Sequence, residues 1–190
     1  AVILGLIQVG GLGIMTLASM VGLMLANRSG LKARMNTAAE ARSAELGDGR
    51  DVVIGVVRMS VLIEAVIAVT LAVRFAVGYD EPVSRAVWLG VFHSISAFNN
   101  AGFALYSDNM ISFATDPWIC VPLMVAVILG GLGFPVLFEV GRRLRQSPAQ
   151  RRERPRWSLH TRLTVHVTAI LLLAGFAAVL VLEWTRTLQP

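Results

Sequence analysis

The sequence is poor in charge. Asp, Glu, Lys and Arg make up only 15% of its 190 residues, whereas 55% are hydrophobic and the mean hydropathy is +0.67. A soluble globular domain carries about 25% charged residues, so this shortage excludes an ordinary soluble fold. The composition instead predicts an integral membrane protein.

Cysteine and the motifs of enzymes are also scarce. The single cysteine, Cys120, excludes an intramolecular disulfide and a cysteine-rich metal site, and we interpret it as a small apolar residue in a helix. His93 and His166 lie in apolar segments without a second ligand at a metal-binding spacing, which predicts helix packing. No nucleophile with its base and no phosphate-binding loop can be recognised. The sequence therefore predicts neither an enzyme nor a structural metal site, and no bound cofactor.

Long hydrophobic runs, by contrast, are abundant. A bilayer core takes about 20 apolar residues in a helix. Three stretches reach this length without a charged residue, at 1–26, 117–138 and 163–182. A fourth, at 59–77, includes Glu64 and Arg74. We expect Glu64 either to hydrogen-bond a neighbouring helix or to take part in an ion path, and Arg74 to extend toward lipid headgroups.

The basic residues decide how the segment between these runs meets the membrane. Of the 17 Lys and Arg residues, six lie in residues 27–58 and eight in residues 142–162. Cytoplasmic loops are enriched in Lys and Arg, so both loops are expected on the cytoplasmic side. A full crossing by residues 86–107 would place them on opposite sides. We therefore expect a re-entrant pore hairpin at 86–107, with a helix over 86–98 and an extended return.

The first residues of that return, Asn99, Asn100, Ala101, Gly102 and Phe103, are the candidate ion-binding site. Irregular backbone at membrane depth is tolerated only inside protein or along a wet path. The C-terminal end of a helix carries about half a negative charge, and extended backbone can offer carbonyl oxygens to a dehydrated cation. Gly102 supplies a position free of side-chain constraint. The alternative is a packing device whose polar residues make ordinary turns.

The loops that flank this hairpin are acidic. They hold Asp80, Glu81, Asp108 and Asp116 against the single Arg85. We expect these residues to form an outer mouth of net charge −3 that concentrates cations, with Asp108 as one of its carboxylates. Helix capping and turns by the same aspartates are the alternative.

A glycine motif occurs twice in the chain. In "IQVGGLGIM" and "VILGGLGFP", the glycines Gly10, Gly11 and Gly13 align with Gly130, Gly131 and Gly133. We expect these glycines to allow close helix packing, and Pro135 to kink its helix. The duplication divides the chain into the closing helix of a first repeat (1–26), a cytoplasmic loop (27–58), a complete second repeat (59–139, with helices at 59–77 and 117–139), a basic loop (140–162) and the opening helix of a third repeat (163–183). Ser158 is the expected N-cap of that last helix.

Four stretches, "IQVGGLGIMTLAS", "FHSISAFNNAGF", "GGLGFPVLFEV" and "WSLHTRL", together resemble the Ktr/Trk/HKT superfamily of potassium transporters. They follow the family's order over almost the whole chain, and they are most similar to the B-type membrane subunit of the Ktr systems. The resemblance implies an all-α integral membrane fold, in which repeats of helix, re-entrant pore hairpin and helix form a potassium-channel-like transporter. Four such repeats in one chain build the family's pore, and this sequence would hold one of them complete, as an internal piece of a longer protein.

The resemblance also implies a function. It implies potassium uptake through a carbonyl-lined selectivity filter, with Gly102 as the filter glycine of the second repeat, K+ as the transported ion and Na+ as an open choice of coupling ion. It implies a homodimer, a cytosolic nucleotide-binding regulatory subunit, contact with membrane lipids, no nucleic-acid partner, and a multi-pass location in a bacterial inner membrane. The alternatives are a Trk-type or Na+-permeable relative of the same fold and, from another class, a non-conducting membrane scaffold subunit.

Overall fold

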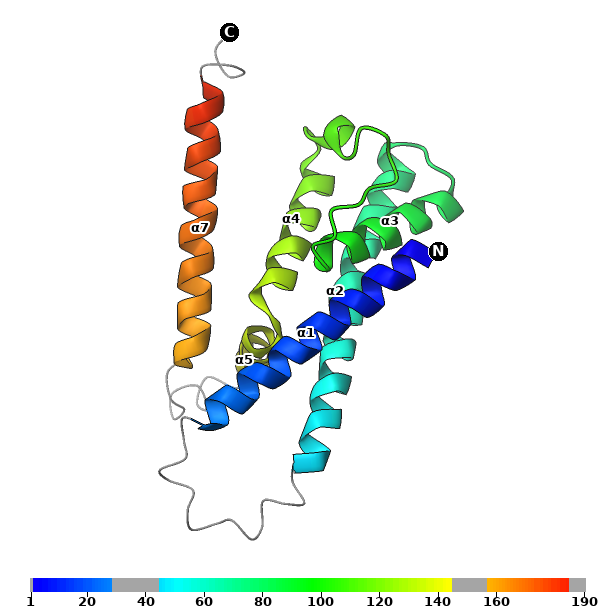
Figure 1. Cartoon of the computed structure of the whole chain (residues 1–190). Helices are drawn as coiled ribbons and strands as arrows, with labels where there is room; N and C mark the ends of the chain where they lie inside the picture. The colour runs from blue at the N-terminus through cyan, green and yellow to red at the C-terminus, as the bar shows by residue number, and fades with distance from the viewer. Residues whose placement is uncertain (1, 29–44, 145–156, 185–190) are drawn as a thin grey trace, which may run out of the picture. The chain divides into compact units, whose positions relative to one another are not determined.

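The computed structural model describes residues 2–28, 45–144 and 157–184, and its regular structure in these ranges is entirely helical (Figure 1). The helices are α1 (Val2–Arg28), α2 (Glu45–Gly78), α3 (Val83–Phe98), the short 3-10 helix η1 (Ile111–Phe113), α4 (Pro117–Leu132), α5 (Phe134–Leu144) and α7 (Leu159–Trp184). This confirms the expectation of an all-α fold. Residues 29–44 and 145–156, which include much of the two basic loops, lie outside the described residues. The chain divides into two units after Gly133, and each is described by itself.

Two of the described helices are long and apolar enough to cross a membrane. They are the part of α2 at Val53–Gly78 and the whole of α7 at Leu159–Trp184. The broken pair of α4 and α5 passes the same test if it counts as one span, whereas the apolar segment Val2–Ile14 of α1 is shorter. Large apolar side chains such as Leu171 are exposed along α7. Helices of this kind are covered by lipid or by other helices, so the structure supports the prediction of a membrane protein.

Helix α2 is longer than its hydrophobic pattern predicts. It begins at Glu45, inside the loop expected at 27–58, and not at Met59. The pattern detects only the part that is uniformly apolar, but a helix continues for as long as backbone hydrogen bonds and packing support it. Val56, which precedes the expected start, is fully buried. Packing of this kind depends on the neighbouring helices and is not visible in the sequence of α2 alone.

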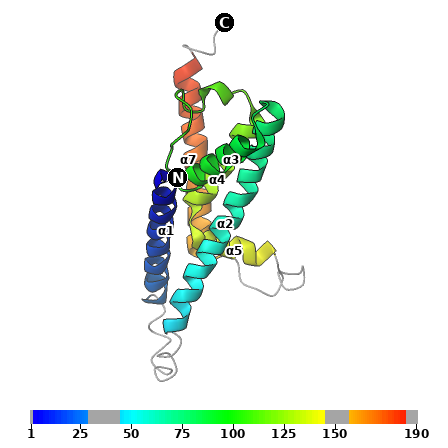
Figure 2. The same ribbon diagram turned by 90° about the vertical axis from the view of Figure 1, so that its right-hand side faces the viewer.

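Helix α3 is short and packs tightly on α2. It begins at Val83, directly after Pro82, and its 16 residues make about 24 Å of helix at about 1.5 Å per residue. This length falls short of the roughly 30 Å core of a bilayer. A Cβ added at Gly90 would lie 2.4 Å from the carbonyl oxygen of Ala68, so only glycine allows this approach to the α2 backbone. Figures 1 and 2 both show α3 against α2, with its C-terminal end beside α1.

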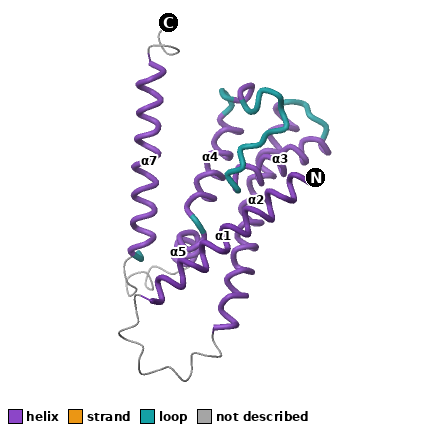
Figure 3. Tube along the Cα trace, in the orientation of Figure 1, coloured by secondary structure: helices purple, strands orange, loops and turns teal. Residues whose placement is uncertain are grey.

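The chain after α3 returns alongside it as an irregular loop (Figure 3). An aromatic cluster, formed by Phe75, Tyr79, His93, Tyr106 and Phe113, holds this loop in place. The Tyr106 ring stacks on His93 at 5.8 Å and meets Phe113 edge-on at 4.9 Å, and Phe113 lies 5.5 Å from Phe75 and 5.0 Å from Tyr79. Such ring pairs contribute about 0.5–1.5 kcal/mol each beyond their burial. The return loop is therefore anchored to both α2 and α3.

The two glycine motifs differ in backbone conformation. Helix α1 runs unbroken through its motif, whereas α4 ends at Leu132 and α5 begins at Phe134. The break lies at Gly133, whose φ of 79° and ψ of 154° are accessible to glycine alone. The kink expected at Pro135 is thus found two residues earlier, and the proline occupies the first turn of α5, where it needs no N–H donor.

In the second unit, Glu139 of α5 joins the start of α7. Ser158 caps α7, because its hydroxyl oxygen accepts the Thr161 N–H at 3.2 Å, which confirms the predicted N-cap. Glu139 accepts the Ser158 N–H at 2.9 Å and the Ser158 hydroxyl at 2.7 Å, and it also accepts the Thr161 hydroxyl. Beside this network, the Arg143 guanidinium lies 4.8 Å from the centre of the Trp157 ring. The sequence around Glu139 did not indicate this role, because its partners lie 19 and 22 residues further along the chain.

Candidate functional site: the turn after α3

The backbone turns sharply where α3 ends. The N–H groups of Asn99, Asn100 and Ala101 donate to carbonyl oxygens in the last turn of α3, at 3.1, 3.0 and 2.8 Å. Asn100 has a φ of 54° and Gly102 a φ of 72°, both in the left-handed region. Asparagine and glycine tolerate this region better than other residues, so "NNAG" is a sequence suited to this reversal.

The turn leaves four consecutive carbonyl oxygens without a donor in the described part of the chain. Within the described residues, no hydrogen bond reaches the carbonyl oxygens of Asn99, Asn100, Ala101 or Gly102, because the N–H groups of the turn are directed back onto α3. The carbonyl oxygen of Phe103 differs, since it accepts the Ser96 hydroxyl at 2.7 Å. Unpaired carbonyl oxygens at membrane depth are costly unless they meet water or a cation.

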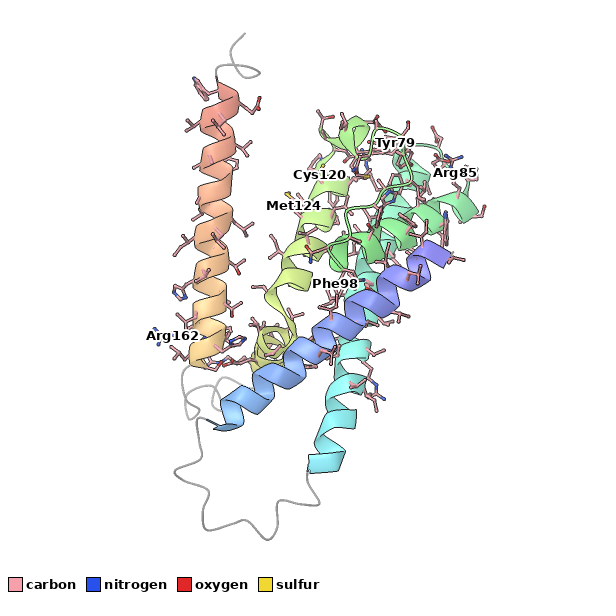
Figure 4. The ribbon with its side chains drawn as sticks, in the orientation of Figure 1. Tyr79, Arg85, Phe98, Cys120, Met124 and Arg162 are labelled. Carbon is pink, nitrogen blue, oxygen red and sulfur yellow. The ribbon has the colours of Figure 1, made fainter. Side chains whose placement is uncertain are left out.

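The exposed side of the turn carries little side-chain bulk. A Cβ added at Gly102 would meet nothing within 4 Å among the described residues. Asn100 and Gly102 are exposed, and the Phe103 side chain is 58% exposed. Figure 4 labels Phe98 at this turn and Tyr79 near the far end of the return loop. The backbone of the turn is thus accessible from one side and held by α3 on the other.

A histidine of α3 holds the return loop further along. The His93 Nδ1 lies 2.8 Å from the Leu89 carbonyl oxygen, which makes Nδ1 the protonated nitrogen of a neutral ring. The other ring nitrogen, Nε2, then accepts the Leu105 N–H at 3.4 Å. His93 is buried, as sequence analysis expected of a packing residue. It also positions backbone next to the candidate site, which its sequence context did not indicate.

Behind the turn lies a polar cluster that the sequence only partly predicted. The Gln8 Nε2 of α1 donates to Glu64 Oε2 at 3.0 Å, and the Asn99 Nδ2 donates to Glu64 Oε1 at 3.2 Å. Glu64 is 6% exposed. The expectation that Glu64 hydrogen-bonds a neighbouring helix is confirmed. Gln8 was missed, although an amide side chain in an otherwise apolar run is a signal of such a contact.

Both glycine motifs approach this turn closely. A Cβ at Gly11 of α1 would lie 1.9 Å from Asn99 Oδ1, and a Cβ at Gly130 of α4 would lie 1.8 Å from the Phe98 carbonyl oxygen. At these two positions the packing leaves room for glycine alone, and the role of the motif glycines as a set stays a prediction. At Gly10, Gly13 and Gly131 an added Cβ would meet nothing within 4 Å in the described part of the chain.

The outer loops do not form the mouth of net charge −3 that the sequence predicts. Asp116 is only 6% exposed, and its Oδ2 accepts Arg74 Nε at 2.7 Å and the Tyr79 hydroxyl at 2.9 Å. Glu81 pairs with Arg85 at 3.1 Å. The expectation that Arg74 extends toward lipid headgroups is therefore wrong, because a carboxylate from the start of α4 reaches it first. Arg74 and Asp116 are 42 residues apart, so no local sequence pattern indicates that they pair.

Two acidic residues of these loops are not paired with a basic side chain among the described residues. Asp80 is exposed in the connection between α2 and α3. Asp108 accepts the Ser112 N–H at 3.1 Å and the Ser112 hydroxyl, and these bonds, above all the one from the side chain, keep the pKa of the Asp108 carboxyl below its ordinary value. Asp108 is thus ionised at neutral pH, and its part in attracting cations stays a prediction.

Replacing Asp116 is expected to destabilise the outer end of the bundle in two distinguishable steps. Asp116→Asn keeps an acceptor for the Trp118 N–H, now 3.0 Å from Oδ1, and removes only the charge, whereas Asp116→Ala removes the helix cap as well. Arg74 is 37% exposed, so solvent screens the ion pair, and the loss of stability in Asp116→Asn should be small. The unfolding temperature of the purified protein should be highest in wild type, lower in Asp116→Asn and lowest in Asp116→Ala. Equal values for Asn and Ala would contradict a capping role.

This pair also predicts a pH dependence. Burial alone would raise the pKa of the Asp116 carboxyl, but hydrogen bonds from Arg74, Tyr79 and the Trp118 N–H hold this pKa below its ordinary value. A depressed folded-state pKa stabilises the fold above the ordinary aspartate pKa of about 4, and this contribution is lost as the pH falls through the lower folded value. The difference in unfolding temperature between wild type and Asp116→Asn should therefore shrink below about pH 4. If this difference in unfolding temperature grew below about pH 4, it would contradict a lowered pKa of the Asp116 carboxyl.

The sequence of this chain matches a family of cation transport proteins. The family model TrkH, described as a cation transport protein, matches residues 2–188. The chain belongs to this family of membrane cation transporters, which confirms the resemblance drawn from its motifs.

Individual relatives are potassium uptake proteins. The chain is 37% identical to the Ktr system potassium uptake protein B of Bacillus subtilis (strain 168), over 97% of this chain and 39% of that protein. It is 36% identical to the protein of the same name from Vibrio alginolyticus, over 94% of this chain and 37% of that protein. It is 27% identical to the potassium/sodium uptake protein NtpJ of Enterococcus hirae, over 95% of this chain and 38% of that protein. The chain thus spans about two fifths of the length of these relatives.

Proposed function

We propose that the full-length protein takes up K+ across the bacterial inner membrane, and that the turn after α3 contributes one quarter of its selectivity filter. The observation that carries this proposal is the row of carbonyl oxygens from Asn99 to Gly102, which accept no hydrogen bond from the described residues. Backbone carbonyls arranged in this way can replace the hydration shell of an alkali cation. The three relatives named above, all potassium uptake proteins by name, support K+ as the ion.

The helix before the turn adds an electrostatic contribution. Helix α3 ends at Phe98, and its C-terminal end presents about half a negative charge beside the carbonyl row. In this proposal α3 enters the membrane only partway, because its 16 residues are too few to cross, and the return loop leads back to the same side. Phe103 closes the filter segment at the point where Ser96 anchors its carbonyl oxygen.

The resemblance and the relatives also shape what we propose for the assembly. The protein is a multi-pass transporter and not an enzyme, and it works as a homodimer with a cytosolic nucleotide-binding subunit. The repeats that complete the pore come from outside this chain. Because one relative is named as a potassium/sodium uptake protein, Na+ is the second ion that the experiment must include.

The proposal is tested at Gly102. Gly102→Asp is expected to abolish uptake of K+ or Rb+, because it places a carboxylate in the proposed filter segment, at a φ of 72° that a side chain strains. The smaller change Gly102→Ser is expected to lower the preference for K+ over Na+, since a hydroxyl alters the oxygens that the ion meets. Uptake is measured in bacterial cells that lack their own potassium uptake systems and produce the full-length protein.

Asn109→Asp is the matched control. Asn109 has a φ of 60°, is exposed, and lies in the outer loop, so the substitution adds the same charge at a similar backbone conformation outside the filter. It should transport like wild type at equal membrane abundance. If wild type transports neither K+ nor Na+, the proposed function is wrong. If Gly102→Asp transports like wild type, the turn is a packing device and the scaffold alternative gains support.

A further inference from the structure

Three polar side chains from three different helices meet behind the turn. Glu64 of α2 accepts Gln8 Nε2 on one carboxylate oxygen at 3.0 Å and Asn99 Nδ2 on the other at 3.2 Å. The Gln8 Oε1 in turn accepts Asn99 Nδ2 at 3.3 Å, which closes a triangle of contacts. We refer to Gln8, Glu64 and Asn99 as the amide–carboxylate triad.

The triad determines which way the Asn99 amide points. The Nδ2 faces three acceptors, since it also lies 2.9 Å from the Ile95 carbonyl oxygen. A flipped amide would turn its oxygen toward these same acceptors, so the orientation is set by the network. The Asn99 Oδ1 is consequently buried against Gly11, and it has no hydrogen-bond partner among the described residues. A buried unsatisfied oxygen is costly, and here it accompanies the orientation that the triad requires.

Glu64 also holds α3 through its backbone. Its carbonyl oxygen accepts the Ser94 hydroxyl at 2.6 Å, in addition to the side-chain contact with Asn99. Among the described residues, no basic side chain pairs with Glu64, so its hydrogen-bonding partners are amides and a hydroxyl. A carboxylic side chain at membrane depth is expensive, and such residues are usually retained for a function.

We propose that Glu64 is a positioning residue for the cation path, which acts through Asn99 on the direction of the first carbonyl oxygens of the turn. This inference rests on the proposed function. Asn99 is the first residue after α3, and its N–H bonds Ile95, so its side chain and backbone are both tied down at the point where the carbonyl row begins. Loosening the side chain would let the row rotate, which changes the number of oxygens that a cation meets. Glu64 itself does not touch the cation.

Glu64→Gln is the first test, because it keeps the shape of the side chain and replaces one acceptor oxygen by a donor NH2. One of the three contacts of the triad must then set donor against donor, whichever way the Gln8 amide points. We expect the preference for K+ over Na+ to fall about tenfold, the size of a lost hydrogen bond. Membrane abundance should be unchanged. A loss of transport in strict proportion to lost protein, with the K+ preference retained, would show a purely structural role and overturn the proposal.

Ser60→Ala is the matched control. Ser60 is buried one turn before Glu64 on the same helix. Among the described residues, its hydroxyl bonds only the Val56 carbonyl oxygen of its own helix, at 3.0 Å. It should keep the K+ preference of wild type. A fall equal to that in Glu64→Gln would mean that any buried polar change in α2 has this effect, which contradicts the specific role of the triad.

An exchange of partners keeps the proposal testable if a single variant fails to fold. Gln8 Nε2 lies 3.0 Å from Glu64 Oε2, so Gln8→Glu alone would bring two carboxylates together. This variant should have a lower preference for K+ than wild type. The double variant Gln8→Glu/Glu64→Gln moves the carboxylate to α1 and restores a donor opposite each acceptor. It should regain most of the K+ preference lost in Glu64→Gln. No recovery in a folded double variant would overturn the proposal.

The outcomes separate this inference from the proposed function. If wild type and Ser60→Ala transport no cation, the proposed function fails before Glu64 is considered. If both transport and Gly102→Asp does not, while Glu64→Gln keeps the wild-type K+ preference, the filter assignment stands and only the role of Glu64 is wrong.

Discussion

Gly130→Ala is expected to abolish transport and to destabilise the folded protein, while Gly131→Ala leaves both almost unchanged. A Cβ at position 130 would lie 1.8 Å from the Phe98 carbonyl oxygen, 2.9 Å from its carbonyl carbon and 3.2 Å from Asn100 Nδ2. Two of these atoms are backbone at the end of α3, so they cannot retreat without moving the turn. Overpacking of this kind costs about 1–3 kcal/mol or more.

Gly131, the next residue of the same helix, is the control for this prediction. An added Cβ at Gly131 would meet nothing within 4 Å among the described residues, and both glycines lie in α4. Each Gly→Ala change gains up to about 1 kcal/mol of helix propensity, so this contribution cancels between the two variants. The measurements are thermal unfolding of the purified protein and K+ uptake at equal membrane abundance. Equal stability and uptake in the two variants would contradict the close approach of α4 to the turn.

Gly11→Ala is expected to impair transport from the other side of the same turn. Its Cβ would lie 1.9 Å from Asn99 Oδ1 and 2.6 Å from Asn99 Cγ, so the amide must leave its position and break its contacts with Gln8 and Glu64. The cost is again about 1–3 kcal/mol. We expect both lower stability and a weaker preference for K+, since the displaced residue starts the carbonyl row.

Two further comparisons test the reason for this effect. Gly10→Ala and Gly13→Ala change the same helix, where an added Cβ meets nothing within 4 Å in the described part of the chain, and should behave like wild type. An Asn99→Ala background removes the two side-chain atoms at 1.9 and 2.6 Å and keeps only the Cβ at 3.0 Å, so Gly11→Ala should cost less stability there than in wild type. Additive losses in this double-mutant cycle would show that the two residues do not interact.

The two glycine motifs share a feature of packing at the end of α3. Gly11 and Gly130 come from motifs that align in sequence, and both place a helix against the end of α3. They are not equivalent positions of the motif, because Gly10 aligns with Gly130 and Gly11 with Gly131. The motif therefore supplies several small residues, and the direction from which each helix approaches selects the one that must be glycine.

Sequence alone predicted much of the organisation of this chain. Composition and long apolar runs indicated a membrane protein, and helices were found at these runs. However, α2 begins earlier, α3 begins at Val83, and the helix expected at 117–139 is broken at Gly133. The polar stretch from Asn99 to Gly102 was found in a sharp turn, and motif order identified the family that residues 2–188 match. These features are local, because helix formation, backbone reversal and hydrophobic runs depend on residues close together in the chain.

Tertiary structure decided which polar groups meet. Arg74 and Asp116 are 42 residues apart, and Gln8 and Glu64 are 56 apart, so no local pattern relates them. The same holds for Glu139 and Ser158, the N-cap of α7, and for the Phe75 and Phe113 rings that help to hold the return loop. Hydrogen bonds and ion pairs are specific to distances of a few ångströms, and only the packing of the helices sets those distances. The sequence by itself determined that this is a membrane protein with an irregular polar turn between its helices. The fold decided which side chains hold that turn and which of its carbonyl oxygens accept no hydrogen bond from the described residues.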